Sequence, residues 1–218
     1  METLPGMNDL KSASLGETWL RLVQSTLQNG ALVDGEYREL LGVQVGFPAV
    51  VGEDEVIRRW GDPGMLANMQ EVFFGQGTNP LGHSYAKLMR GPDGRADLSD
   101  IISLLRSEPA SKRALVTLCG AGGGKVPCIN AIQFLVRAGQ VQILYFARGQ
   151  DAFKKFYADA LCIANMARRV ADALGLPAGG VTGFLGSSHV YVADQPAIED
   201  FLSRGNQWLL HGAAKGVD

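Results

Sequence analysis

The sequence predicts an α/β or α+β fold in which one mixed β-sheet is flanked by helices. Strand-like and helix-like segments follow one another without strict alternation, and two strand-like runs are joined by a very short turn. The 218 residues are 46% hydrophobic and 19% charged, which suffices for one core. No linker or internal repeat divides the chain, so we expect a single domain over residues 1–218.

Helices are expected where apolar residues recur at a spacing of three or four positions. In the first such segment Trp19 and Val23 fall on one face, and Gly30 ends the run. The longest segment stops at Gly175. The predicted helices are 17–29, 65–74, 97–107, 153–174 and 195–204. The remainder of 61–94 is rich in Gly, Pro and Asn and is expected to form loops.

Strands are expected where β-branched and aromatic residues cluster. The runs 129–137 and 141–148 are separated only by Ala138, Gly139 and Gln140, which predicts an antiparallel hairpin. The predicted strands are 42–51, 113–119, 129–137, 141–148 and 181–192.

Charge and composition narrow the classes of function. Twenty Lys and Arg against 22 Asp and Glu give a net charge of −2, so we expect no binding to nucleic acid or to a membrane surface. No apolar run approaches the roughly 18 residues of a spanning helix, and the first residues do not resemble a signal peptide. A cytoplasmic location with reduced cysteines is therefore expected. The three cysteines are too few and too scattered for a disulfide framework or a zinc site, and we expect no metal.

The glycine cluster Gly120–Lys125 is similar to a phosphate-binding loop but departs from it twice. Val126 follows the lysine where Ser or Thr is required, and Cys119 occupies the place of the first glycine. We expect a connector between two strands.

Cys128 is the candidate nucleophile. It follows Pro127 at the start of a predicted strand, with Lys112, Arg113 and Arg148 in flanking segments. Nearby cations lower the pKa of a thiol and make the thiolate available. A cysteine in a strand-rich region can equally be core filling, and the residues alone leave that alternative open.

An ordered set of motifs around Cys128 resembles the thymidylate synthase superfamily. The motifs are Val126-Pro127-Cys128, Gln133-Phe134, Arg148-Gly149-Gln150-Asp151, Asp159 and Gly186-Ser187-Ser188-His189-Val190-Tyr191. Weaker upstream similarities are Ser111-Lys112-Arg113, Leu81-Gly82-x-x-Tyr85 with Arg90, and Arg38 with Gly42. The resemblance implies a thymidylate-synthase-like mixed sheet, one face of which pairs two subunits about a two-fold axis.

The resemblance also implies roles. Cys128 would add to C6 of a pyrimidine nucleoside monophosphate, so that C5 can attack the one-carbon unit of 5,10-methylenetetrahydrofolate. Arg38 and Arg148 would bind the 5′-phosphate, and Lys112 and Arg113 would reach the same phosphate from the partner of a homodimer. The remaining assignments are His189 and Tyr191 to the sugar hydroxyl, Gln133 to support of the thiol, Asp151 to the base or cofactor, and Glu71 to proton transfer.

Each of these residues also has an ordinary structural explanation. The arginines and lysines could be solvated surface charges. His189 and Tyr191 fall on one face of a strand and could be packing residues. Asp151 could only cap the helix that follows it.

Asp159 stands where the family has the asparagine that recognises uracil. The carboxylate can accept from the exocyclic amino group of cytosine, and with a shared proton it also serves N3. Asp replaces Asn here in the family's deoxycytidylate hydroxymethylases and in cytidylate hydroxymethylases of nucleoside-antibiotic pathways. The resemblance therefore implies C5-hydroxymethylation of CMP or dCMP. The neighbours of Asp159 leave open the alternative that it faces solvent.

Other departures from the family concern the folate and the phosphate. The family's C-terminal segment, which closes over folate, has no counterpart after residue 205. Met89 replaces a Trp, Ile129 a His, and Gly149 a phosphate-binding Ser. Two alternatives follow: a C5-methyltransferase or hydroxymethylase of a uridine nucleotide, and a catalytically inactive nucleotide-binding homologue.

Overall fold

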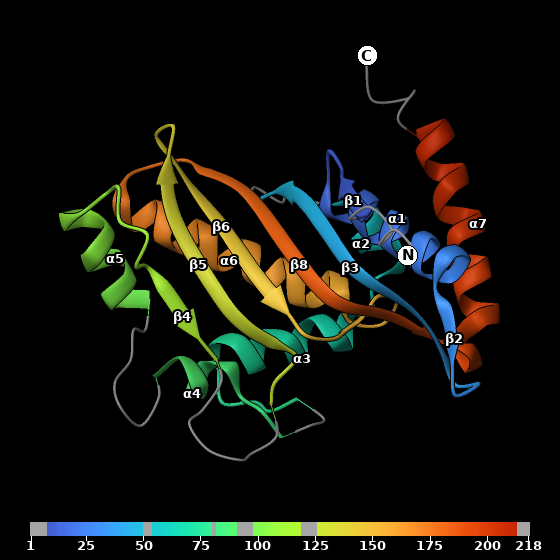
Figure 1. The fold of residues 1–218 in the computed structure, drawn as a ribbon. Coiled ribbons are helices and arrows are strands. Elements are labelled where there is room, and N and C mark those ends of the chain that lie inside the picture. Colours follow the sequence, from blue (N-terminus) through green and yellow to red (C-terminus); the bar gives the residue numbers. More distant parts are fainter. Residues whose placement is uncertain (1–7, 50–53, 80–81, 91–97, 119–125, 213–218) are drawn as a thin grey trace, which may run out of the picture.

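A computed structural model describes residues 8–49, 54–79, 82–90, 98–118 and 126–212. These residues form an eight-stranded mixed sheet in the order β1-β3-β8-β6-β5-β4, with β2 beside β3 and β7 beside β8 (Figure 1). The strands are β1 (Asn8–Lys11), β2 (Ala31–Val33), β3 (Tyr37–Pro48), β4 (Leu115–Thr117), β5 (Ile129–Arg137), β6 (Gln140–Ala147), β7 (Gln150–Asp151) and β8 (Ala178–Tyr191). β1 runs parallel to β3, and β6 and β7 run parallel to β8, whereas the other pairs are antiparallel.

The helices gather behind the sheet as it is seen in Figure 1, with α6 crossing behind its centre and α1 and α7 at one end. They are α1 (Leu15–Asn29), α2 (Glu55–Trp60), α3 (Pro63–Phe74), α4 (Tyr85–Arg90), α5 (Leu98–Ser107), α6 (Phe156–Leu174) and α7 (Gln195–Gly212), with a 3₁₀ turn at Val192–Asp194. Within the described part of the chain, no helix covers the front face of the sheet. The predicted mixed sheet flanked by helices is confirmed.

The elements differ from the prediction mainly at their ends. The strand predicted over 42–51 begins at Tyr37, and the helix predicted over 195–204 continues to Gly212. In the predicted strand 113–119 only Leu115–Thr117 pairs, and Cys119 lies outside the described residues. The short helices α2 and α4 replace expected loops or unassigned chain, and β1 and β2 were not expected at all.

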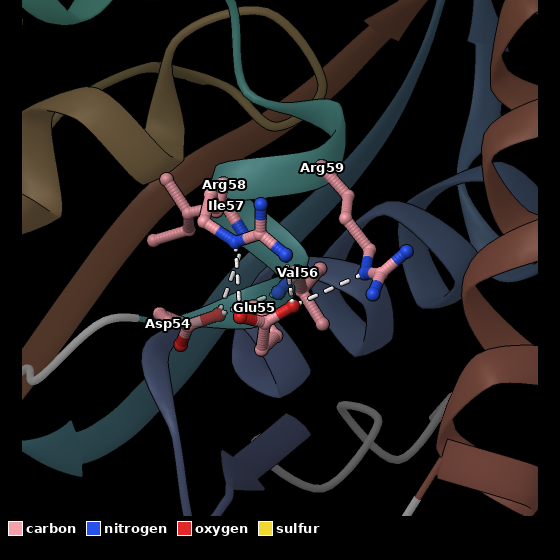
Figure 2. Close-up of polar contacts among 6 residues, drawn as sticks. All are labelled: Asp54, Glu55, Val56, Ile57, Arg58 and Arg59. Atoms are coloured by element: carbon pink, nitrogen blue, oxygen red, sulfur yellow. Dashed lines mark hydrogen bonds and ion pairs between the residues drawn. The ribbon is translucent and has the colours of Figure 1, made fainter.

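Helix α2 shows how a short element is held in place (Figure 2). The Asp54 carboxylate accepts from the backbone N–H groups of Val56 and Ile57 at 3.0 and 3.2 Å, and so satisfies donors that a helix start leaves unpaired. Its second oxygen accepts from Gly16 N at 2.7 Å, which ties α2 to the start of α1. Glu55 pairs with Arg58 and Arg59 on the exposed face.

The predicted hairpin between β5 and β6 is present and has a two-residue turn. Arg137 pairs with Gln140, and the two residues between them have φ of 50° at Ala138 and 73° at Gly139. Positive φ at both positions is the geometry of the type I′ turn, which matches the twist of the flanking strands.

The core lies between the sheet and the helices. Trp19 of α1 joins three helices, because its ring lies 4.2 Å from that of Tyr157 in α6 and 4.3 Å from that of Phe201 in α7, centroid to centroid. Its indole N–H points to the carbonyls of Ala152 and Phe153 at 3.0 and 3.1 Å. Trp19 therefore anchors the loop that leads from β7 into α6. None of the helices in the described ranges has the length and apolarity needed to cross a membrane.

Candidate active site

A cavity of about 370 Å³ opens on the front face of the sheet where β3, β8 and the end of β6 meet. It is lined by Tyr37, Glu39, Arg148, Gly149, Ser187, His189 and Tyr191. Three of these residues, Arg148, His189 and Tyr191, are predicted site residues.

The register of β3 and β8 brings the cavity side chains together. Glu39 pairs with His189 and Tyr37 with Tyr191, and directly opposed residues of antiparallel strands share a face. The Ser187 hydroxyl donates to Glu39 Oε1 at 2.5 Å. The His189 ring makes edge contacts with the rings of both tyrosines at centroid distances of 5.7 and 5.5 Å. The cavity therefore combines groups that can hydrogen-bond to the hydroxyls of a sugar with aromatic rings that can pack against the sugar.

Arg148 connects this cavity to the candidate nucleophile. Its guanidinium donates to the carbonyls of Val126 and Pro127 at 2.7 and 3.1 Å, and its backbone N–H donates to the carbonyl of Cys128 at 2.8 Å. The side chain stays exposed and also lines the cavity. One arginine thus holds the backbone around the thiol and presents a positive charge where an anion could dock.

Cys128 is half-buried, whereas Cys162 is 1% exposed in the middle of α6. Burial raises the pKa of Cys162, and the Asp159 charge raises it further, so this thiol stays protonated and inert. Tyr85 of α4 is fully buried beside Cys128, and its hydroxyl accepts from Ile129 N at 3.4 Å. Cys128 is therefore not sealed in the core as simple filling.

Asp159 is 1% exposed on the first turn of α6, so it does not face solvent. Its Oδ2 accepts from the Gln150 amide at 3.1 Å and lies 3.4 Å from Lys155 Nζ. Its Oδ1 and the Gln150 Oε1 are buried without a hydrogen-bond partner in the described structure. Two buried acceptors are thus left open on side chains that are hydrogen-bonded to each other, an arrangement that native cores avoid unless a ligand or water supplies donors.

Lys155 and Tyr85 each interact electrostatically with both Asp159 and Cys128. The pKa of Lys155 is raised, because the charges of Asp159, Cys128 and Asp151 outweigh the burial that lowers it. The pKa of Tyr85 is raised by burial first and then by the charges of Asp159 and Cys128. Lys155 is accordingly a protonated ammonium and Tyr85 a neutral phenol.

His189 and Asp151 are paired in the register of β7 and β8. Burial lowers the pKa of His189, although the charges of Asp151 and Glu39 oppose it. Burial raises the pKa of Asp151, whose Oδ1 accepts from the backbone N–H groups of Phe153 and Lys154 at 3.0 and 2.8 Å. Asp151 thus shapes the turn before α6, and its other carboxylate oxygen is not engaged in these two bonds.

The remaining predicted site residues lie apart from the cavity. Arg38 pairs with the buried Val190, so it occupies the back face of β3, where it donates to the Gly30 carbonyl at 3.2 Å. Glu71 is exposed on α3 and accepts from Gln76 N at 3.3 Å, beyond the end of its own helix.

Lys112, Arg113 and Gln133 lie near the opposite edge of the sheet. Gln133 donates to the Lys112 carbonyl at 2.8 Å, and the exposed Arg113 forms a two-pronged ion pair with Glu108 at 2.7 and 2.8 Å. In the same chain β6 lies between this edge, formed by β4 and β5, and the strand β8 that lines the cavity.

The structure adds site residues that were not predicted: Tyr37, Glu39, Tyr85, Gln150, Lys155 and Ser187. Tyr85, Gln150 and Ser187 stand inside the quoted motifs, so a signal existed for them. Glu39 and Tyr37 had none, since only the pairing of β3 with β8 brings them to His189. The connector at 120–125 lies outside the described residues, and the described residues contain no group of three or more His, Cys, Asp or Glu placed to hold a metal ion.

Comparison with known proteins identifies the family. The family model described as thymidylate synthase matches residues 55–210. A protein named "Putative thymidylate synthase" from Methanosarcina barkeri is 21% identical over 212 residues, which cover 90% of this chain and 95% of the relative. A protein of the same name from Methanocaldococcus jannaschii is 23% identical over 202 residues, covering 84% and 90%. The "Thymidylate synthase" of Mycoplasma mobile is 24% identical over 144 residues, covering 64% and 50%.

The matched range contains Cys128, Asp159 and all the cavity residues except Tyr37 and Glu39. The chain belongs to the thymidylate synthase family, whose members are one-carbon transferases that act at C5 of a pyrimidine nucleotide with methylenetetrahydrofolate.

Proposed function

We propose that this protein hydroxymethylates C5 of a cytidine nucleotide, CMP or dCMP, through covalent addition of Cys128 to C6. The observation that carries the choice of base is the pair of open acceptors at Asp159 Oδ1 and Gln150 Oε1. The amino group of cytosine offers two N–H donors, whereas uracil presents a carbonyl oxygen at the same place. Two buried acceptors facing that oxygen would be left unpaired, at a cost of about 1–3 kcal/mol each.

The nucleotide would extend from this pair to the cavity on the front face. Arg148 would bind the 5′-phosphate, since it is exposed and borders both the cavity and the thiol loop. Glu39, His189 and Tyr191 would contact the sugar hydroxyls. We leave Arg38 and Glu71 out of the site, because Arg38 lies on the back of β3 and Glu71 bonds to its own helix end.

The proposed chemistry begins with the Cys128 thiolate, which attacks C6 and makes C5 nucleophilic. Arg148 keeps the thiol in place through the Val126 and Pro127 carbonyls, and Asp159 orients the base. Methylenetetrahydrofolate, the one-carbon donor of the family, would supply the carbon that C5 attacks. The polar side chains described around Cys128 are already assigned to binding the base or to positioning the thiol, so we assign none of them to the folate.

A test of the proposal measures tritium release from CMP, dCMP, UMP and dUMP labelled at C5, with and without methylenetetrahydrofolate, and identifies the product by mass. Release from the cytidine nucleotides with a 5-hydroxymethyl product is expected. Cys128→Ala should abolish it, and Cys162→Ala, which alters the buried cysteine, should not. Release from uridine nucleotides alone would identify a uridylate enzyme of the same fold, and no release with any nucleotide would identify an inactive homologue.

We propose further that the working unit is a two-fold homodimer formed through the front of the sheet. Leu41, Leu115 and Phe146 are 65, 43 and 44% exposed on β3, β4 and β6. Exposure of several large apolar side chains on one face of a sheet is unfavourable for an isolated chain and is typical of an interface. A partner on this face could bring its Lys112 and Arg113 to the phosphate, in keeping with their distance from the cavity of their own chain. Phe146→Asp should convert the dimer to a monomer in sedimentation equilibrium and raise the KM for nucleotide. A monomeric wild-type protein at micromolar concentration would contradict the proposal.

A further inference from the structure

Lys155 occupies a position that helix stability does not explain. It is the residue immediately before α6, with φ −128° and ψ −31°, and its side chain makes no capping hydrogen bond. The N-terminus of a helix carries partial positive charge and favours Ser, Thr, Asp or Asn, so an ammonium there is unfavourable. Local rules of this kind are broken most often where a side chain has a function.

The surroundings of Lys155 are those of a site rather than of a surface. Its side chain is only 16% exposed, and its Nζ lies 3.4 Å from Asp159 Oδ2, whose side chain is 2% exposed. The neighbouring lysine, Lys154, is 51% exposed and pairs with Asp194 at the outer surface. Two adjacent lysines therefore differ in burial, and Lys155 lies close enough to Cys128 for the two groups to interact electrostatically.

The cluster holds both acceptors and donors that a base could use. Asp159 Oδ1 and Gln150 Oε1 are open acceptors, and Lys155 keeps N–H groups beyond the one that faces Asp159 Oδ2. Cytosine carries the complementary groups next to each other, with the amino group at C4 beside the acceptor N3. A base whose amino group lies on the two open acceptors would therefore present N3 toward the ammonium.

We propose that Lys155 is a catalytic residue that donates a proton to N3 of the base when Cys128 adds to C6. As the S–C6 bond forms, the C5=C6 electron pair moves to C4–C5, and the C4=N3 pair takes the proton from Lys155. The lysine is left as a neutral amine and C5 as an enamine carbon. When C5 forms its new bond, N3 returns the proton to Lys155. No electrons are gained or lost, and Asp159 does not have to share a proton.

This inference rests on the proposed function, because it requires a pyrimidine bound at Cys128. The experiment compares Lys155→Met and Lys155→Arg with the wild-type protein and with the control Lys11→Met, an exposed lysine on the edge strand β1, and measures tritium release at C5 and CMP affinity separately. Lys155→Met should release tritium at least about 100-fold more slowly than wild type, which is the range that a general acid contributes. Lys11→Met should keep the wild-type rate.

The Lys155→Arg variant tests proton transfer separately from the positive charge and the packing of the lysine side chain. Arginine keeps a positive partner for the buried Asp159 but does not give up its proton near neutral pH. We expect this variant to melt within a few degrees of wild type and to bind CMP within about threefold, yet to release tritium as slowly as Lys155→Met. A fast Lys155→Arg variant would overturn the proton transfer, even if Lys155→Met failed to fold.

The remaining outcomes distinguish this inference from the proposed function. If wild type acts only on uridine nucleotides, the base assignment fails and the proton transfer to N3 fails with it, because N3 of uracil already carries a hydrogen. If wild type acts on CMP and both Lys155 variants keep its rate, the inference fails while the proposed function stands. A wild-type protein inactive on all four nucleotides would overturn both.

Discussion

The Gln150 amide donates to Asp159 Oδ2 at 3.1 Å, while the other oxygen of each side chain is buried without a hydrogen-bond partner in the described structure. Gln150 directly follows the pocket glycine Gly149, and Asp159 lies on the first turn of α6. The contact therefore joins the cavity side of the site to the helix that carries the candidate base-recognition residue.

Asp159→Asn should shift the base preference. The asparagine amide can donate both to Gln150 Oε1 and to a uracil O4, so the ratio of kcat/KM for uridine over cytidine nucleotides should rise at least about tenfold, equivalent to 1.4 kcal/mol. Tritium release from all four labelled nucleotides measures this ratio. Asp172→Asn, on the exposed part of the same helix, is the control and should leave it unchanged. An unaltered ratio in Asp159→Asn would remove Asp159 from base recognition.

Gly149→Ser should improve nucleotide binding. Gly149 lines the cavity beside Arg148, and a Cβ built there meets no atom within 4 Å. The added hydroxyl can donate to a phosphate, which is worth about 0.5–1.5 kcal/mol, or a two- to tenfold lower KM. Cytidine, which lacks the phosphate, provides the comparison, and its affinity should not change. Equal effects on nucleotide and nucleoside would argue against a phosphate next to Gly149.

His189 should make the protein less stable in mild acid. Burial holds the folded-state pKa of His189 below its usual value, so the unfolded chain takes up the proton first as the pH falls. The free energy of unfolding therefore decreases as the pH drops through the unfolded pKa of about 6.5, and the loss is complete below the folded pKa. In His189→Asn this contribution is absent. Melting of both proteins between pH 5 and 7.5 should show the steeper decline in wild type, and parallel curves would contradict the assignment.

Ala138→Asn should stabilise the hairpin between β5 and β6. Ala138 has φ of 50°, a left-handed conformation that asparagine adopts more readily than alanine, and Asn-Gly is the preferred type I′ pair. We expect a gain of about 0.5–1 kcal/mol in the free energy of unfolding, measured with urea. Ala138→Val should lose stability, because a β-branched residue is strained at positive φ. A stabilising valine would show that the turn relaxes to another type.

The periodic segments were predictable because each shows several repeats of its pattern. α6 and the β5–β6 hairpin follow directly from such patterns. The six-residue helices α2 and α4 and the two- to four-residue strands β1, β2 and β7 are too short for a period to emerge. They form because contacts with other parts of the fold stabilise them, as the hydrogen bond between Gly16 and Asp54 does for α2.

The candidate site was predictable only where a motif carried it. Cys128, Arg148 and His189 stand in ordered motifs, and the structure places the last two in one cavity. Burial of Asp159 and Lys155 could not be read from their neighbours, since charged residues at a helix start are usually solvated. Glu39 joins the cavity only through the alignment of β3 with β8, which depends on the packed sheet as a whole.

The hydrogen bonds from Arg148 to the Val126 and Pro127 carbonyls would couple the binding of a substrate to the position of the Cys128 segment. An anion that docks on this guanidinium would tighten or reorient the same hydrogen bonds that hold the sulfur-bearing segment. Recognition at one end of a ligand would then be transmitted to reactivity at the other. A nucleoside without its anionic group would thus be penalised in turnover as well as in affinity.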